Sequence, residues 1–195
     1  MQNAKRTNGI PKTTGATIAK PETRGHFLEL CAGQAPQLGQ KDVCDDIEVA
    51  RITQEDYFLG NVCFEKAFTA ARKPATHVVV SLPCTGGRVG TWTFVNEKTP
   101  NAEQMIQEEQ RKFFKLLRAA EFVCTVATEH GGWVTFELPR YNRYWSTAAV
   151  KSFCLRFKLQ FAHLDVCAFG LHDRHGNLVK KPWRFASSCV PIHER

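Results

Sequence analysis

The sequence has no long hydrophobic run and no recognisable leader segment. No apolar stretch approaches the roughly 18 residues that a membrane-spanning helix needs, and no charged-then-apolar segment opens the chain. We therefore expect a protein that neither spans a membrane nor is secreted. The 195 residues, 43% of them hydrophobic and 23% charged, are enough for one domain with a core, and they exclude a chain that is disordered throughout.

The cysteines lack the spacing of a metal knuckle. No two of the eight lie closer than 13 residues, so there is no CxxC pair and no zinc-finger pattern, and we predict no metal site. Most of them follow a β-branched or aromatic residue inside an apolar stretch, as small buried side chains do. This usage indicates an intracellular, reducing compartment, either the cytoplasm or the nucleus. Cys84 has different neighbours and is considered separately below.

The first 25 residues contain almost no large apolar side chain. They hold five basic residues against one acidic residue. We predict a flexible basic arm over residues 1–25 and a single α/β domain over residues 26–195. An unselected linker from a longer protein is at least as good an interpretation of this composition as an arm that binds nucleic acid.

Short apolar runs alternate with amphipathic stretches from residue 26 onward. The alternation predicts a doubly wound, Rossmann-like α/β fold with a mostly parallel sheet and a terminal antiparallel hairpin. In such sheets, ligands bind beyond the carboxyl ends of the strands. The expected strands cover residues 26–31, 47–53, 76–82 and 133–138. The expected helices cover residues 62–72 and 100–130, and a third helix is capped by Ser146 and runs to residue 157. Residues 162–169 and 183–187 are expected to form the hairpin.

Two chemically active residues follow neighbouring strands of this pattern. Cys84 comes directly after Pro83 at the end of a hydrophobic strand and before two glycines, which is the position of a nucleophile. Glu137 ends the next strand between two apolar residues, where a carboxylate is costly without a partner. If the strands are adjacent, the thiol and the carboxyl lie near each other. Such a pair suits addition of a thiolate to an electron-poor ring carbon while the acid holds a ring nitrogen. No histidine has a spacing that makes it the base for cysteine hydrolysis.

The earlier strands end in residues that are typical of nucleoside sites. Residues 29–33 (Glu-Leu-Cys-Ala-Gly) form a small-residue turn that a ligand can approach closely. Asp56 follows the second strand, where nucleoside-binding sheets carry a carboxylate for the ribose. Each feature has a structural alternative, since the first also suits an ordinary turn and the second a helix cap.

At these residues the chain resembles the cytosine-C5 methyltransferases of the class I S-adenosylmethionine-dependent superfamily. Residues 29–33 resemble the first motif of that family, Leu82-Pro83-Cys84 its Pro-Cys motif, and residues 136–138 stand where the family has Glu-Asn-Val. The resemblance implies that Cys84 attacks C6 of cytosine, that Glu137 contacts N3, and that S-adenosylmethionine is the cofactor. It further implies that the cofactor pocket is lined by Glu29, Ala32, Gly33, Asp56 and Pro83.

The chain also resembles, more closely, domains of uncharacterised dinoflagellate mobile-element and viral-type polyproteins. The shared segments are residues 83–87, 136–140, 167–171 and 181–185. The chain departs from the methyltransferase pattern at residues 34–36, where further glycines are expected, and at Leu138, which replaces the family's Asn. The alternative function is therefore a catalytically inactive methyltransferase-like module that binds nucleic acid within such a polyprotein.

The net charge of +7 lies entirely in the last part of the chain. Residues 138–195 hold ten basic and three acidic residues, and aromatic residues are interleaved with the basic ones. Cations for phosphates beside flat rings for bases predict DNA or RNA as the partner. A solvated basic face whose tryptophans belong to the core is the alternative. The predicted nucleic-acid-binding residues are Arg140, Arg143, Tyr144, Trp145, Lys180, Lys181 and Arg184.

Overall fold

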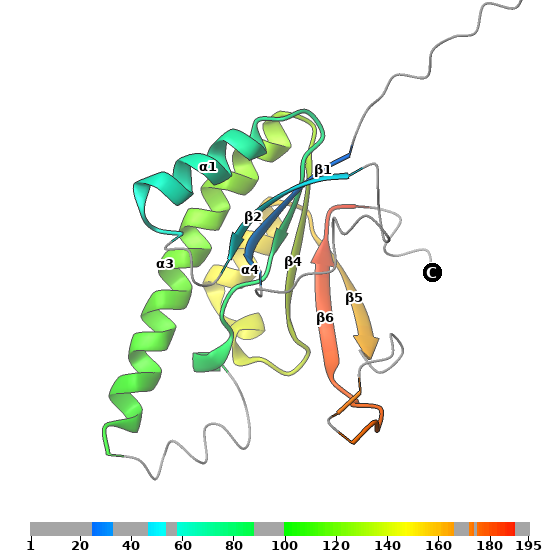
Figure 1. Ribbon diagram of the computed structural model, residues 1–195. Coiled ribbons are helices and arrows are strands. Elements are labelled where there is room, and N and C mark those ends of the chain that lie inside the picture. Colours follow the sequence, from blue (N-terminus) through cyan, green and yellow to red (C-terminus); the bar gives the residue numbers. More distant parts are fainter. Residues whose placement is uncertain are drawn as a thin grey trace, which may run out of the picture.

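A six-stranded sheet, in the order β2-β1-β3-β4-β6-β5, forms the centre of the computed structural model (Figure 1). The structure describes residues 25–32, 47–53, 58–87, 100–165, 172–173 and 175–189. The arm predicted for residues 1–25 lies outside these ranges except for Gly25, which begins β1. The strands are β1 (Gly25–Ala32), β2 (Ile47–Thr53), β3 (His77–Val80), β4 (Trp133–Pro139), β5 (Gln160–Asp165) and β6 (Pro182–Ser187).

Five of the six strands run in one direction. β1 pairs in parallel with β2 and β3, and β3 pairs in parallel with β4. β6 lies between β4 and β5 and is antiparallel to both. The predicted α/β class, the mostly parallel sheet and the antiparallel pair near the C-terminus are therefore confirmed. The β5–β6 connection turns at Gly176, whose φ of +82° is accessible to glycine without strain.

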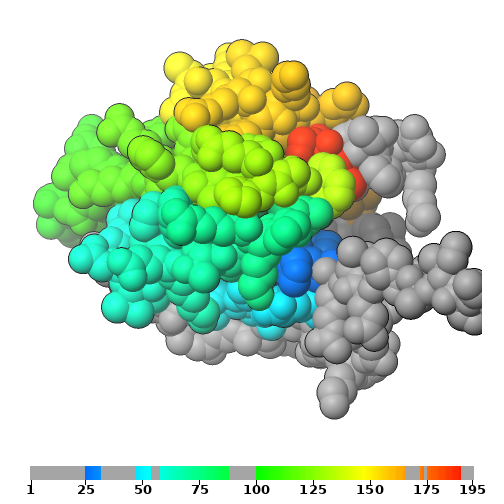
Figure 2. Space-filling view, turned by 90° about the horizontal axis from the view of Figure 1, so that it is seen from above, coloured from blue at the N-terminus to red at the C-terminus, as the bar shows by residue number. Residues whose placement is uncertain are grey.

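Three helices of the described residues, α1 (Asn61–Ala71), α3 (Ala102–Glu129) and α4 (Ala148–Arg156), cover one face of the sheet. Seen from above, they lie in succession across the molecule, coloured cyan-green, green and yellow (Figure 2). Thr147 caps α4 by accepting a hydrogen bond from Val150 N at 3.4 Å, so the prediction that Ser146 caps this helix was one residue early. No helix in the described ranges is long and apolar enough to span a membrane.

The doubly wound arrangement requires helices on both faces of the sheet. Within the part of the chain that the structure describes, no helix lies on the second face. Residues 33–46, which join β1 to β2, lie outside the described ranges, so the double winding stays a prediction.

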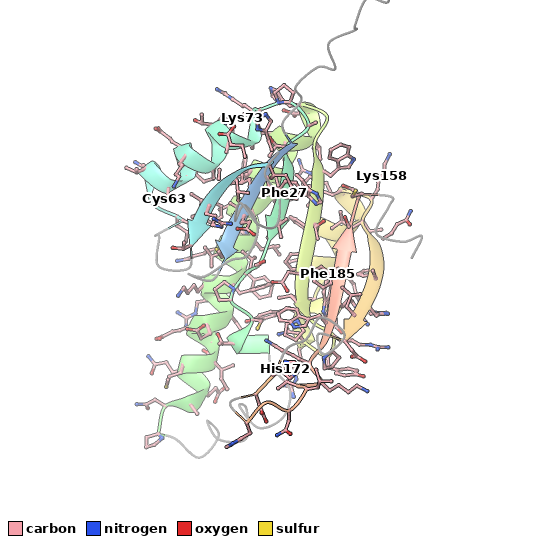
Figure 3. The ribbon with its side chains drawn as sticks, turned by 45° about the vertical axis from the view of Figure 1, so that its right-hand side comes forward. Phe27, Cys63, Lys73, Lys158, His172 and Phe185 are labelled. Carbon is pink, nitrogen blue, oxygen red and sulfur yellow. The ribbon has the colours of Figure 1, made fainter. Side chains whose placement is uncertain are left out.

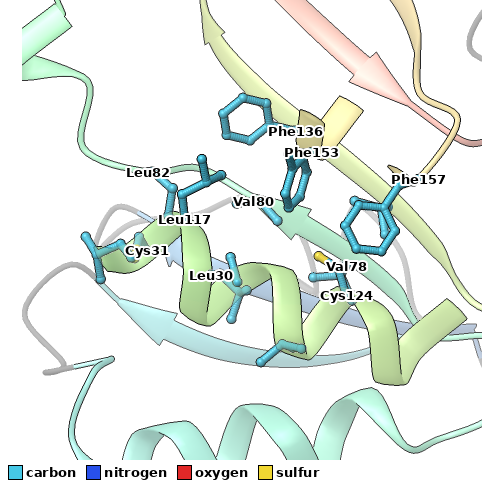
Figure 4. Packing of buried hydrophobic residues seen from close by; sticks show 14 of the residues in the cluster. Leu30, Cys31, Val78, Val80, Leu82, Leu117, Cys124, Phe136, Phe153 and Phe157 are labelled. Atoms are coloured by element: carbon cyan, nitrogen blue, oxygen red, sulfur yellow. The ribbon is translucent and has the colours of Figure 1, made fainter. Parts of the chain in front are cut away.

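The core lies between the sheet and the three helices. Because side chains alternate along a strand, one set faces the helices, and its members Leu28, Val80 and Phe136 have no exposed surface. Phe136 meets Phe153 of α4 with ring centroids 5.4 Å apart (Figure 4). Burying each such side chain stabilises the fold by about 1.5–3 kcal/mol. The opposite face carries the intervening residues, including Phe27 and Phe185 (Figure 3). We call it the open face because no helix of the described residues covers it.

The strand order reverses at β1. β2 lies on one side of β1 and β3 on the other, so the edge outside the carboxyl ends of β1 and β3 is a topological switch point, where open α/β sheets bind ligands. The carboxyl ends of the parallel strands point toward the bottom of Figure 1, near the short 3-10 helix η1 (Thr85–Gly87).

Candidate active site

Cys84 lies just beyond β3, at the carboxyl edge of the sheet. Leu82 still packs in the core, and the half-buried Cys84 side chain contacts the edge of the same core. The carbonyl oxygen of Cys84 accepts a hydrogen bond from Asn142 Nδ2 at 3.0 Å and another from the N–H of Gly87 at 3.2 Å. The backbone at the nucleophile position is therefore held in place from the β4–α4 connection.

The loop after Cys84 is also tied to α3. The Thr85 hydroxyl donates to Glu109 Oε2 at 2.5 Å, and Gln110 Nε2 donates to the Gly86 carbonyl at 3.2 Å. Gly86 and Gly87 are buried, and a Cβ added at Gly87 would lie only 2.2 Å from Asn142 Oδ1. The two glycines are therefore closely surrounded by neighbouring side chains and leave no open space at this point of the loop. They allow the loop to pack closely.

Tyr144 fills the space beside these glycines. Its ring stacks on Phe113 with a centroid distance of 3.7 Å, and its buried hydroxyl has no hydrogen-bond partner among the described residues. Burial raises the pKa of Tyr144, and the nearby Glu109 carboxylate and Cys84 thiol raise it further. The hydroxyl thus stays protonated and lies close to the Cys84 thiol.

Glu137 lies at the carboxyl end of β4, on the open face. β3 and β4 are neighbours in the sheet, as the prediction required. Burial raises the pKa of Glu137 to about 7, against a hydrogen bond from the Ser81 side chain and the positive charge of Lys181, which both lower it. The carboxyl group is therefore available in both protonation states near neutral pH.

Cys84 and Glu137 reach the same edge of the sheet but have different neighbours. The Cys84 loop packs against Asn142 and Tyr144, whereas Glu137 is joined to Ser81, three residues before Cys84. His77 is at the other, amino end of β3, where it bonds Thr135 Oγ1 at 2.7 Å and burial lowers its pKa to about 4. It is not placed to serve as a base for Cys84.

The residues assigned to the cofactor by resemblance have mixed positions. Glu29 is 6% exposed and pairs with Arg51 Nε of the neighbouring strand at 2.5 Å. Ala32 ends β1 and the half-buried Pro83 follows β3, so both lie at the switch point. Gly33 and Asp56 lie outside the described residues. The strand ends therefore fit a nucleoside cofactor in position, while the Glu29 carboxylate is already engaged by an arginine.

Cys31 has a left-handed backbone conformation near the end of β1. Its φ is +59°, at an irregularity in the pairing between Leu30 and Ala32. This left-handed conformation is uncommon for a residue with a side chain and costs about 1 kcal/mol or more. The thiol lies near Leu82 and Leu117 on the helix-covered side (Figure 4), and burial raises its pKa to about 11. Cys31 is thus a core residue that shapes the strand end.

Two of the predicted nucleic-acid-binding residues are part of the core. Tyr144 is 2% and Trp145 7% exposed. The Trp145 indole donates to the Pro139 carbonyl at 3.0 Å, and its ring packs on Phe136 at 5.3 Å. Both rings pack in the core in this structure, which accounts for their burial, and the base-stacking role predicted for them stays a prediction.

The predicted basic residues divide between the two faces of the sheet. Lys181 lies 4.7 Å from the ring of Trp183 on the open face, near Glu137. Arg184, the next residue after Trp183, points to the helix-covered side, since neighbours on a strand alternate. Arg143 is exposed. Lys180 is exposed and is 3.8 Å from an Asp165 carboxylate oxygen.

Three residues near the site were not predicted from the sequence. Ser81 bonds Glu137, Asn142 holds the Cys84 backbone, and His163 accepts a hydrogen bond from Arg184 at 3.0 Å. The Pro139–Asn142 turn that brings Asn142 to Cys84 depends on a hydrogen bond from Asn142 N to the Pro139 carbonyl at 3.0 Å. An asparagine shortly after a strand and a proline was the only local signal.

The carboxyl edge of the sheet has no group of metal ligands among the described residues, and the chain has no match among known proteins that would indicate a function. Among the described residues, no group of three His, Cys, Asp or Glu side chains could hold a metal ion. Compared with protein-family models, curated proteins and solved structures, the chain matches none. Its own residues therefore carry any functional conclusion.

Proposed function

We propose that the protein is an S-adenosylmethionine-dependent methyltransferase that acts on C5 of cytosine in nucleic acid, with a class I methyltransferase-like, Rossmann-like fold. The observation that carries the proposal is the position of Cys84 and Glu137 at the carboxyl ends of the adjacent central strands β3 and β4. The mostly parallel sheet with its antiparallel pair near the C-terminus also agrees with the sheet predicted from the sequence.

The two side chains suit opposite sides of a cytosine ring. C6 and N3 lie across the six-membered ring from each other, so a thiol and an acid that act on them bracket the base and need not touch. Cys84 and Glu137 lie at one edge with different neighbours, which agrees with that requirement. The buried, protonated Tyr144 hydroxyl beside Cys84 is a neutral neighbour that leaves the thiol reactive.

In the proposed reaction the Cys84 thiolate forms a bond to C6, and the displaced electron pair moves through C4 to N3. N3 takes the proton of Glu137, which a pKa of about 7 makes available at neutral pH. Bound S-adenosylmethionine would supply the methyl group for the electron-rich C5. Water then takes the C5 proton, the C5–C6 double bond re-forms, and the sulfur–C6 bond breaks with its electron pair leaving on sulfur, which restores the Cys84 thiolate. N3 returns its proton to the Glu137 carboxylate.

One observation favours a second function, a catalytically inactive nucleic-acid-binding module. Glu29 stands where the resemblance places an acid of the cofactor pocket, yet its carboxylate is bonded to Arg51 at 2.5 Å. An acid committed to a cross-strand ion pair is less able to bind a ligand. If the protein is the proposed enzyme, Ala32 and Pro83 at the strand ends would hold the cofactor, and Glu29 would not.

Calorimetry with S-adenosylmethionine and a methyl-transfer assay separate these functions. The folded protein should bind the cofactor, and Cys84→Ser should lower transfer to cytosine by about 1,000-fold or more while leaving cofactor affinity unchanged. Cys63→Ser, the same change at a half-buried cysteine of α1, should retain transfer. Absence of cofactor binding, or full transfer by Cys84→Ser, rules out the proposed enzyme.

Nucleic-acid binding should depend steeply on salt. Each phosphate contact releases counterions, so the affinity for an oligonucleotide should fall about tenfold or more between low and physiological salt. Arg143→Ala should weaken binding, because Arg143 is an exposed cation beside the Cys84 edge. An affinity that does not change with salt would contradict a nucleic-acid partner.

A further inference from the structure

Three strands bring two arginines and a histidine together on the helix-covered side of the carboxyl edge. Leu138 of β4, Arg184 of β6 and His163 of β5 are aligned across the sheet. Arg184 Nε donates a hydrogen bond to His163 Nε2 at 3.0 Å. Arg140, just past β4, is tied to the start of β6 by a hydrogen bond from its N–H to the Pro182 carbonyl at 3.0 Å. Arg140 and Arg184 both lie close enough to His163 for their charges to act on its imidazole.

Aromatic rings hold the Arg184 guanidinium in a fixed position. Its Cζ lies 5.4 Å from the ring centroid of Trp145 and 5.6 Å from that of Phe161. The two rings meet edge to face at 5.7 Å, with Trp145 buried and Phe161 52% exposed. A guanidinium oriented by rings and an imidazole keeps its fork of remaining N–H donors pre-organised for a planar or tetrahedral anion.

The positive charge of this cluster has little compensation. Among the described residues, no carboxylate forms an ion pair with Arg140 or Arg184. Asp165, two residues after His163 on β5, is 3.8 Å from Lys180 Nζ. Because His163 accepts from Arg184, its imidazole is neutral, and burial and the charges of Arg140 and Arg184 lower its pKa. The neutral His163 imidazole does not neutralise the positive charges of the two arginines, so these charges can attract an anion.

We propose that Arg140 and Arg184, with Arg184 positioned by His163, bind a backbone phosphate of a single-stranded nucleic acid. Phe161 and Tyr141 are the surfaces on which the flanking bases stack. Tyr141 is 69% exposed, and the Arg140 guanidinium lies 5.7 Å from its ring. Unpaired bases stack on exposed rings, whereas bases in a duplex are already stacked. The proposal rests on the nucleic-acid part of the proposed function and not on methyl transfer.

Fluorescence anisotropy with a labelled oligothymidylate of about twelve nucleotides tests the site. Arg184→Gln should weaken binding about tenfold and reduce the slope of log K against log salt by about one. Arg118→Gln removes the same charge from the exposed surface of α3 and should change neither quantity appreciably. Phe161→Ala should also weaken binding about tenfold but leave the salt slope unchanged, because stacking releases no counterions. Thermal denaturation confirms that each variant is folded.

Several outcomes would overturn this assignment. Equal losses for Arg184→Gln and Arg118→Gln would mean diffuse attraction without a site. Tighter binding of the matching duplex, with no effect of Phe161→Ala, would exclude single strands as the preferred ligand. Displacement of the oligonucleotide by inorganic phosphate at matched ionic strength would mean a site for free phosphate. The oligothymidylate contains no cytosine, so its binding is measured independently of methyl transfer, and failure of methyl transfer leaves this result intact.

Discussion

Glu137→Gln should stabilise the folded protein at pH 8 by about 3 kcal/mol and should make its stability less dependent on pH. The pKa of Glu137 is raised from 4.5 to about 7 by burial. Between these two values the folded state retains the proton that the unfolded state loses. The free energy of unfolding therefore falls by about 1.4 kcal/mol per pH unit as the pH rises through this interval. Glutamine is neutral throughout and avoids that loss.

Urea denaturation at pH 4 and pH 8 measures this effect. The variant and the unmodified protein should have similar stability at pH 4, where the Glu137 carboxyl is protonated in both states, and should differ most at pH 8. Glu129→Gln makes the same change at an exposed position near the end of α3 and should leave the pH profile unaltered. An unchanged profile for Glu137→Gln would show that the carboxyl is not held in its neutral form.

The same substitution separates the two proposed functions. A glutamine cannot pass a proton to N3, so methyl transfer should fall by about 100-fold or more. Higher stability together with lower activity is typical of a residue that is retained for function at a cost to the fold. If the protein only binds nucleic acid, Glu137→Gln should raise stability and leave affinity unchanged.

Hydrophobic periodicity predicted most of the elements correctly. The expected strand at residues 47–53 matches β2 (Ile47–Thr53), and the helix expected at residues 62–72 matches α1 (Asn61–Ala71) to within one residue. The antiparallel pairing of β5 with β6 followed from the turn residues around Gly176. These features depend on neighbours in the chain, which a single sequence displays directly.

The side-chain environments were less predictable, because they depend on contacts between distant residues. Tyr144 and Trp145 stand among basic residues in a connection, yet their rings are buried against Phe113 of α3 and Phe136 of β4. Glu29 bonds Arg51, 22 residues later, because parallel pairing aligns the two residues. Such partners follow from register and packing, which local patterns do not determine.

Gly87→Ala should destabilise the protein by about 3 kcal/mol and lower Tm by about 6–12 °C. The new Cβ would lie 2.2 Å from Asn142 Oδ1 and 2.8 Å from Tyr144 Cδ2. Neither neighbour can move easily, since Asn142 bonds both the Cys84 carbonyl and Tyr144 N, and Tyr144 is stacked on Phe113. Gly25→Ala is the control, because among the described residues its Cβ would meet only Ile47, at 3.8 Å, and its effect should stay within about 0.5 kcal/mol.

A double-mutant cycle with Asn142→Ala identifies the cause of this destabilisation. If the Asn142 side chain is the main obstacle, Gly87→Ala should cost less in the Asn142→Ala background, with a coupling energy of about 1 kcal/mol or more. Additive effects would mean that the Tyr144 ring, or the backbone of the loop, resists the methyl group. Since the Cys84 carbonyl is held by the same Asn142 amide, Asn142→Ala should also lower methyl transfer without changing cofactor affinity. Full activity in Asn142→Ala would show that close packing of this loop serves the fold alone.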